Sequence, residues 1–175
     1  MQSVKVVVTG PFNAGKTTFI KAVSEITVLS TERQISEGAG EGSGETTVAM
    51  DFGRITVSDD VVLYLFGTPG QARFSFMWET LSEGMLGFVL LVDTTEPDTY
   101  NDAKEMIGFF TEMSDVPFVV AANKVDADDT ETIRQMRADL GLADKVPLLP
   151  VDARDKESVK AVLLGLLYEI LESMG

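Results

Sequence analysis

The sequence contains neither cysteine nor histidine, and both absences limit its chemistry. Without cysteine there are no disulfides and no thiol nucleophile, so the chain is compatible with a reducing compartment. Without histidine there is no imidazole base and no histidine metal ligand. Any catalysis must therefore come from carboxylates, amides, lysine, backbone groups or a bound metal ion.

Long apolar runs and positive charges are also scarce. Apolar stretches such as 88–92 are far too short to cross a bilayer, and neither a signal peptide nor a lipidation motif is visible. The 28 acidic and 14 basic residues give a net charge of −14, which disfavours nucleic acid and anionic membranes as partners. We therefore expect a cytoplasmic protein with no direct membrane anchor, folded as a single domain over residues 1–175.

The most informative segment of the sequence is residues 4–19, VKVVVTGPFNAGKTTF. The valine-rich start predicts a buried parallel strand, and a helical pattern opens at Lys16. Between them, residues 10–17 fit the phosphate-binding pattern G-x-x-x-x-G-K-[ST], in the strand–loop–helix context that this pattern needs. The glycines let the loop turn its N–H groups toward phosphate oxygens. The residues predicted to bind phosphates are Gly10, Asn13, Ala14, Gly15, Lys16, Thr17 and Thr18.

Two side chains of this phosphate loop have more specific predicted roles. Lys16 would reach the β- and γ-phosphates and stabilise charge on the transferring phosphoryl group, which makes it a candidate catalytic residue. The Thr17 hydroxyl would bind Mg²⁺. The loop therefore predicts a nucleoside triphosphate site with magnesium, but it leaves the base open.

The rest of the chain alternates between strand and helix patterns. Strands are predicted over 46–57, 61–66, 85–93, 116–122 and 146–151, and helices over 98–113, 128–140 and 156–173. Residues 27–45, with a glycine tract at 38–44, predict a long functional loop, and residues 68–84 are irregular or weakly helical. This order predicts an α/β fold. It has about six strands, mostly parallel, one antiparallel edge strand at the Asp59-Asp60 hairpin, and helices on both faces.

The tetrapeptide Asn123-Lys124-Val125-Asp126 indicates the base. It directly follows the predicted strand 116–122, at the sheet edge where α/β proteins bind ligands. The Asp126 carboxylate can accept from both the ring N–H and the exocyclic amine of guanine, and adenine offers no such donor pair. The Asn123 amide can tie this loop to the phosphate loop, and the Lys124 stem can lie over the base plane. The sequence therefore predicts GTP and GDP as ligands.

With both motifs in place, the chain resembles the Ras-like small GTPases over essentially its whole length. The resemblance implies that the α/β fold is a P-loop NTPase G domain. Residues 67–71, Gly-Thr-Pro-Gly-Gln, occupy the place of the D-x-x-G-Q segment that opens the family's switch II. The resemblance implies that the Gly70 amide contacts the γ-phosphate and that Gln71 is catalytic, orienting the attacking water. It also implies that a switch I threonine, Thr46 or preferably Thr47, binds Mg²⁺.

The resemblance extends to the base site and to partners. Residues 151–154 match the family's S-A-K segment, which implies that Asp152, Ala153 and Arg154 lie at the guanine, with the Ala153 amide on its carbonyl oxygen. The patterns F-G-T-P-G-Q and T-T-x-A-M-D-F-G are similar to a prokaryotic branch that includes gliding-polarity and conservon-type GTPases. Members of that branch work with roadblock-domain proteins, so the resemblance implies a roadblock-type activator.

Two residues depart from the family pattern. The switch II aspartate that holds Mg²⁺ through water is Gly67 here. Asp51 is the candidate replacement, because it lies on the strand paired with the one ending at Phe66; the alternative is a solvent-facing strand residue. Phe12 stands where Ras proteins carry glycine, and its ring would crowd Gln71 and slow hydrolysis. Alternatively, Phe12 folds over the nucleotide at no kinetic cost.

Switch II also carries a run of aromatic and basic residues, namely Arg73, Phe74, Phe76, Met77 and Trp78. Such residues dominate protein interfaces, so this run predicts a nucleotide-dependent partner surface. We expect some of the aromatic rings to be buried as core and others to be presented. Arg73 is either an internal arginine finger or a solvated or ion-paired side chain.

These observations predict a monomeric GTPase switch that hydrolyses GTP slowly and depends on an activator. Switch loops at about 38–47 and 68–78 would signal the nucleotide state to regulators and effectors. One alternative is a guanine-nucleotide-gated scaffold with negligible hydrolysis. Another is an ATP-driven P-loop enzyme, which residues 123–126 disfavour.

Overall fold

The computed structural model describes residues 2–36, 45–70 and 75–175, with the backbone alone described at 29–36 and 45–49. Its strands are β1 Gln2–Thr9, β2 Leu29–Ser36, β3 Glu45–Ser58, β4 Val61–Gly67, β5 Gly87–Asp93, β6 Phe118–Asn123 and β7 Leu148–Val151. Its helices are α1 Lys16–Val23, α2 Phe76–Ser82, α3 Tyr100–Met113, α4 Thr130–Leu140 and α5 Lys156–Met174, with a short 3-10 helix at Pro97–Thr99.

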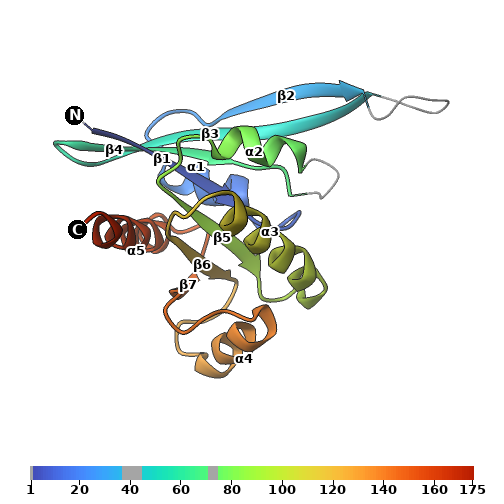
Figure 1. The fold of residues 1–175 in the computed structure, drawn as a ribbon, viewed down its shortest axis with the longest axis vertical. Coiled ribbons are helices and arrows are strands. Elements are labelled where there is room, and N and C mark those ends of the chain that lie inside the picture. Colours follow the sequence, from blue (N-terminus) through green and yellow to red (C-terminus); the bar gives the residue numbers. More distant parts are fainter. Residues whose placement is uncertain (1, 37–44, 71–74) are drawn as a thin grey trace.

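The strands form one sheet in the order β2-β3-β4-β1-β5-β6-β7, seen from top to bottom in Figure 1. β1 is parallel to β4 and β5, and β6 is parallel to β5 and β7. Only β3 runs against its neighbours, β2 and β4, among the strands that the structure describes. The predicted α/β class, the mostly parallel sheet and the helices on both faces are confirmed.

The sheet departs from the prediction at one end. In the part of the chain that the structure describes, it has seven strands where about six were predicted. The additional strand β2 lies within residues 27–45, which the sequence predicts to be a loop. As a result, the antiparallel strand β3 is inside the sheet and β2 forms its edge. The sequence of β2, LSTERQIS, lacks a clear alternation of apolar and polar residues, so its pairing with β3 has no signal in the local pattern. The glycine tract at 38–44 lies outside the described residues.

Two apolar layers hold the helices to the sheet. Alternate residues of β1 point to opposite faces, so Val6 and Val8 pack with α1 and α5 whereas Val7 packs with α2 and α3. All seven residues of β5 are buried, as expected for a central parallel strand with helices on both faces. The buried residues of α5 are Val159, Val162, Leu163, Leu166 and Ile170. This packing fixes the strand ends from which the functional loops leave.

Candidate functional site

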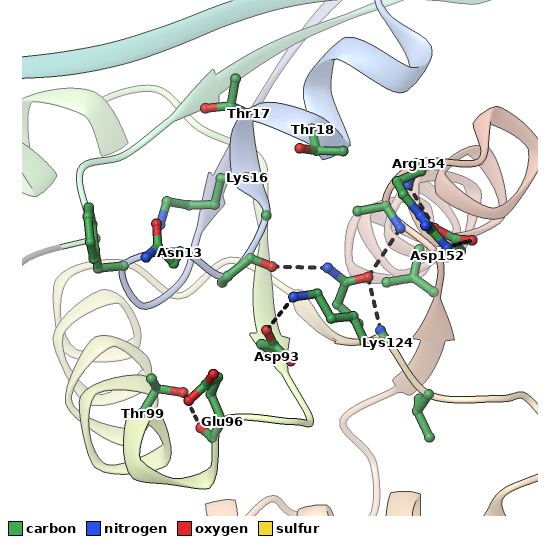
Figure 2. Close-up of a pocket in the computed structure, with 18 of the residues that line it drawn as sticks. Asn13, Lys16, Thr17, Thr18, Asp93, Glu96, Thr99, Lys124, Asp152 and Arg154 are labelled. Atoms are coloured by element: carbon green, nitrogen blue, oxygen red, sulfur yellow. Dashed lines mark hydrogen bonds and ion pairs between the residues drawn. The ribbon is translucent and has the colours of Figure 1, made fainter.

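A cavity of about 1410 Å³ opens at the carboxyl ends of the parallel strands. The loops that follow β1, β4, β5, β6 and β7 contribute to its walls. Figure 2 shows its polar side chains converging from these loops. The predicted site residues that line it are Asn13, Ala14, Gly15, Lys16, Thr17, Thr18, Asp51, Gly70, Asn123, Lys124, Asp126, Asp152, Ala153 and Arg154. The structure therefore brings together segments predicted from separate parts of the sequence.

The phosphate loop has a backbone that two glycines make possible. Gly10 has φ of 153° and Gly15 has φ of 108°, in the region that side chains with a Cβ rarely adopt. A Cβ at Gly10 would lie 2.2 Å from the Leu91 carbonyl oxygen, and one at Gly15 would lie 2.8 Å from Asn123 Nδ2. Asn13 also has positive φ, at 65°, which asparagine tolerates better than most residues. The loop curls tightly between β1 and α1 as the motif predicts.

Lys16 is folded back into this loop. Its ammonium donates to the carbonyl oxygens of Gly10, at 2.6 Å, and Pro11, at 2.9 Å. Burial lowers the pKa of Lys16 from 10.5 to about 8, and the nearby Asp51 carboxylate opposes this shift only in part. The loop therefore holds a cation that is only weakly compensated, and an anionic ligand would stabilise its charged form.

Thr17 and Asp51 form a hydrogen-bonded pair beside the phosphate loop, at what we call the phosphate end of the cavity. The Thr17 hydroxyl donates to Asp51 Oδ2 at 2.5 Å, and Asp51 is only 9% exposed. Asp51 is the register partner of Gly67, and a Cβ at Gly67 would lie 3.3 Å from the Asp51 Cβ. The carboxylate of β3 thus lies beside the residue where the family pattern has an aspartate. A hydroxyl and a carboxylate next to a phosphate loop are hard oxygen donors that fit Mg²⁺.

Asn123 joins three loops at the other end of the cavity. Its side-chain amide donates to the Ala14 carbonyl oxygen at 3.0 Å, which is the predicted tie to the phosphate loop. Its Oδ1 accepts from the N–H groups of Lys124, at 3.0 Å, and Ala153, at 3.2 Å. Asn123 is 4% exposed. A single buried amide therefore fixes the relative positions of the loops after β1, β6 and β7.

The loop after β7 contains the predicted residues Asp152, Ala153 and Arg154. Ala153 is buried, and its N–H, expected from the resemblance to face guanine, donates to Asn123 Oδ1 in this structure. Asp152 accepts from Arg154 Nε at 3.0 Å and also from the Arg154 N–H. These hydrogen bonds lower the pKa of Asp152. Asp126 lies exposed at the cavity wall, where its carboxylate is accessible to a ligand.

Asp93 is a site residue that the sequence analysis missed. It ends β5, directly beside Asn123 at the end of β6, and is 4% exposed. Burial alone raises its pKa, but hydrogen bonds from Lys124 and Thr95 outweigh this, so the pKa of Asp93 is lowered overall. A signal was available, because an acidic residue at the end of a wholly apolar strand lies at the sheet edge where ligands bind.

The switch residues are described only in part. The indole N–H of the buried Trp78 donates to the Pro69 carbonyl oxygen at 2.8 Å, whereas Phe76 is 58% exposed. The expected division into buried and presented aromatic rings therefore holds for these two. Phe12, also 58% exposed, lines the cavity. Thr47 lies on β3, opposite Gln34, where only the backbone is described. Gln71, Arg73 and Phe74 lie outside the described residues.

The glycine loop between β1 and α1, the sheet order and the ligand cavity at the strand ends define a P-loop GTPase-like α/β fold. The chain belongs to the family described as conserved hypothetical ATP binding proteins, whose model matches residues 29–173. That match begins after the phosphate loop, so the loop is independent support for the class.

Individual relatives support the same class. An uncharacterized protein of Methanocaldococcus jannaschii is 34% identical over 129 residues, which cover 74% of this chain and 75% of that protein. Ras-related protein RABD1 of Arabidopsis thaliana is 27% identical over 140 residues, and GTP-binding protein YPT1 of Saccharomyces cerevisiae is 28% identical over 138 residues. These two matches each cover 74% of this chain and 66% of the relative. Among the described residues, no helix has the length and apolar character needed to cross a bilayer.

Proposed function

We propose that this protein is a small GTPase switch that binds GTP and GDP with Mg²⁺ and hydrolyses GTP slowly. The observation that carries the proposal is the buried Asn123, which ties the loop of Asp126 to the phosphate loop of Lys16 across one cavity. The loop proposed to bind the base and the loop proposed to bind the phosphates therefore line the same cavity. Relatives named Ras-related and GTP-binding proteins support this assignment.

The choice of guanine rests on Asp126. Its exposed carboxylate is an acceptor for two adjacent donors, which guanine presents and adenine does not. The family description names ATP instead, so the two nucleotides must be compared directly. A site that hydrogen-bonds a substrate group usually discriminates strongly against an analogue that lacks it. We therefore expect a large preference for GTP over ATP.

At the phosphate end, the chain's own groups position and stabilise the reacting phosphate. Lys16 and the loop N–H groups neutralise charge on the β- and γ-phosphates, and the Gly70 amide contacts the γ-phosphate. Thr17, with Thr47 and Asp51 as further oxygen donors, would hold Mg²⁺ directly or through water. The ion supplies Lewis-acid stabilisation of the phosphate oxygens when bound. Gln71 orients the water that attacks the γ-phosphorus.

The output of the switch is the ordering of loops 38–47 and 68–78 by the γ-phosphate and their release on hydrolysis. β3 supports this coupling, because it carries both Thr47 and Asp51 and pairs with β4, whose end leads into switch II. Regulators and effectors would read these loops, and a roadblock-type activator fits the resemblance to the prokaryotic branch. We assign the protein to the cytoplasm as a monomer.

A second candidate function is a guanine-nucleotide-gated scaffold with negligible hydrolysis. Phe12 favours it, since its exposed ring lies at the cavity beside the segment that leads to Gln71. Gly67 favours it too, because the usual switch II carboxylate is absent there. The complete phosphate loop and Gln71 argue for turnover.

Single-turnover hydrolysis of GTP and ATP, with Mg²⁺ and with EDTA, tests the proposal on the wild type and on Gln71→Ala. GTP-specific, Mg²⁺-dependent hydrolysis that falls in Gln71→Ala supports the switch. Tight GTP binding without turnover in either protein favours the scaffold, and preferential binding of ATP would overturn both.

Replacing Asp126 by asparagine sharpens the assignment of the base. An asparagine amide accepts one hydrogen bond and donates another, so Asp126→Asn should lose affinity for GDP and gain affinity for xanthosine diphosphate. Asp128→Asn, which removes the same charge at a nearby exposed position outside the cavity, is the matched control. Unchanged GDP affinity in Asp126→Asn would contradict the role given to this carboxylate.

A further inference from the structure

The end of the cavity formed by Asn123, Lys124 and Asp126, where the base is proposed to bind, is called the base end. There an ion pair joins the buried carboxylate of Asp93 to the exposed side chain of Lys124. Asp93 is the last residue of β5, whose other six residues are apolar and buried. Burying a carboxylate is unfavourable unless it is paired and hydrogen-bonded. Asp93 Oδ1 accepts from the Thr95 N–H at 2.8 Å and its hydroxyl at 2.6 Å, and Oδ2 accepts from Lys124 Nζ at 2.8 Å. The carboxylate is therefore well paired, by the loop after its own strand and by the loop after β6.

The side chain of Lys124 lies along the cavity because of this pair. The residue follows β6 and has φ of 66°, and its N–H donates to Asn123 Oδ1. Figure 2 shows the Lys124 side chain reaching back toward Asp93, with its ammonium at the carboxylate. The Lys124 side chain is 56% exposed, whereas that of Asp93 is 5% exposed. The charged end is thus bound to a buried partner, and the methylene stem is left to face a ligand.

Thr94 makes the two loops one unit. Its hydroxyl donates to the carbonyl oxygens of Asn123, at 3.0 Å, and Lys124, at 3.2 Å. Its N–H donates to the same Asn123 oxygen at 3.1 Å. Asp93 and Thr94 are consecutive, so two neighbouring residues at the end of β5 bind residues 123–124, while Thr95 binds the Asp93 carboxylate. The Lys124 side chain is therefore held at both of its ends, at the backbone and at the ammonium.

We propose that Asp93 is a positioning residue for nucleobase recognition: it fixes the Lys124 stem as a flat apolar surface against which the purine ring lies. This inference rests on the proposed binding of guanine nucleotides. A purine face stacks on apolar surface regardless of its substituents, so Asp93 acts on affinity for the base while Asp126 selects guanine.

The test compares Asp93→Asn with Asp98→Asn, which removes the same charge from an exposed position five residues away and outside the cavity. Calorimetric titration measures the dissociation constants of GDP and of pyrophosphate, which lacks a base. Loss of a hydrogen bond to a charged group should weaken GDP binding about tenfold in Asp93→Asn. Pyrophosphate binding should stay within about twofold of wild type, and Asp98→Asn should resemble wild type with both ligands.

A double-mutant cycle separates positioning from a merely structural role. If Asp93 acts through Lys124, Asp93→Asn should have no further effect on GDP binding in a Lys124→Met background. Equal losses for GDP and pyrophosphate, or full additivity with Lys124→Met, would overturn the inference and leave the proposed function standing. GDP affinity in Asp93→Asn equal to that of Asp98→Asn would do the same. Failure of the wild type to bind any guanine nucleotide would instead overturn the proposed function, and this inference with it.

Discussion

The two ends of the cavity are built in different ways. At the base end, side chains bind one another and the backbone of neighbouring loops: Asn123 joins three loops, and Asp93 holds Lys124. At the phosphate end, shape comes from backbone conformation at Gly10 and Gly15. The functional side chains there bind groups that a nucleotide would compete with. Lys16 donates to carbonyl oxygens of its own loop, and Thr17 donates to Asp51.

If the protein is the proposed switch, this difference assigns nucleotide recognition to one end of the cavity and the response to the γ-phosphate to the other. The base end is organised before a ligand arrives, so it can supply specificity without a large ordering cost. At the phosphate end, the proposed function requires phosphate oxygens to replace the carbonyl oxygens that Lys16 binds. Thr17 can bind Mg²⁺ through its hydroxyl oxygen while its O–H still donates to Asp51. We therefore expect substitutions at the base end to affect stability or affinity in every state, and those at the phosphate end to affect mainly the response to ligand.

The largest effect is expected at Asn123. Asn123→Ala removes hydrogen bonds to Ala14 and from the N–H groups of Lys124 and Ala153, and leaves buried polar groups without these partners. Such losses should lower the free energy of unfolding by about 3 kcal/mol. Urea denaturation without nucleotide measures it. Asn101→Ala, at an exposed position on α3, is the control and should change stability by less than about 0.5 kcal/mol. If Asn123→Ala lowers the free energy of unfolding by less than about 1 kcal/mol, this amide does not stabilise the base end.

How much of this site the sequence predicts depends on how local each signal is. The phosphate loop and residues 123–126 are short, contiguous patterns whose residue types follow from their chemistry. Asp51 could be proposed because its strand was expected to pair with the strand that ends at Phe66, and the structure places it opposite Gly67. Asp93 has a local signal, an acid at the end of an apolar strand, but its pairing with Lys124 depends on the parallel register that brings the end of β5 beside the end of β6.

The same contrast explains the fold. The apolar patterns of the sequence predicted β1, β5 and the helices. β2 was not predicted, because it is defined by its pairing with β3 and not by its own sequence pattern. Pairings between distant segments have no local signal, so the parts that depend on them are the ones that a single sequence does not reveal. The catalytic assignment of Gln71 came from the resemblance and remains a prediction.

At the phosphate end, Asp51 gives the next largest expected effect. Asp51→Asn keeps the shape of the side chain but removes the charge that would hold the metal's water shell. Groups that support metal ligands typically account for 10- to 100-fold in affinity, so Mg²⁺ should slow GDP dissociation about tenfold less in this variant than in wild type. Release of fluorescent methylanthraniloyl-GDP, with Mg²⁺ and with EDTA, measures this ratio.

The matched control is Asp59→Asn, an exposed acid at the turn between β3 and β4. Its ratio should equal that of the wild type. Dissociation in EDTA should be the same for all three proteins, because the carboxylate is proposed to act only with the ion. An unchanged Mg²⁺ effect in Asp51→Asn would return Asp51 to a structural role on β3.

The pH dependence of binding comes next and reports on Lys16. Its pKa is lowered to about 8, so between pH 8 and 10.5 the nucleotide-free folded protein holds fewer protons than the unfolded chain. This one group therefore makes the free energy of unfolding rise with pH across that window. Phosphate binding favours the charged lysine, so GDP affinity should fall as pH rises, by about tenfold between pH 7 and 9. Lys21→Met should show the same fall, because Lys21 is exposed and outside the cavity. A flat profile would mean that Lys16 stays charged throughout.

The smallest effect is expected from Trp78, which connects the start of switch II to the core. Trp78→Phe keeps an aromatic ring against Phe109 and Phe110 but removes the N–H that donates to the Pro69 carbonyl oxygen. Losing that hydrogen bond should cost about 1 kcal/mol of unfolding free energy, whereas Phe76→Ala, at an exposed position, should cost little. Since Pro69 adjoins the predicted γ-phosphate reader Gly70, Trp78→Phe should also slow single-turnover GTP hydrolysis while leaving GDP affinity unchanged. A loss of GDP affinity instead would mean that the two ends of the cavity are not separable.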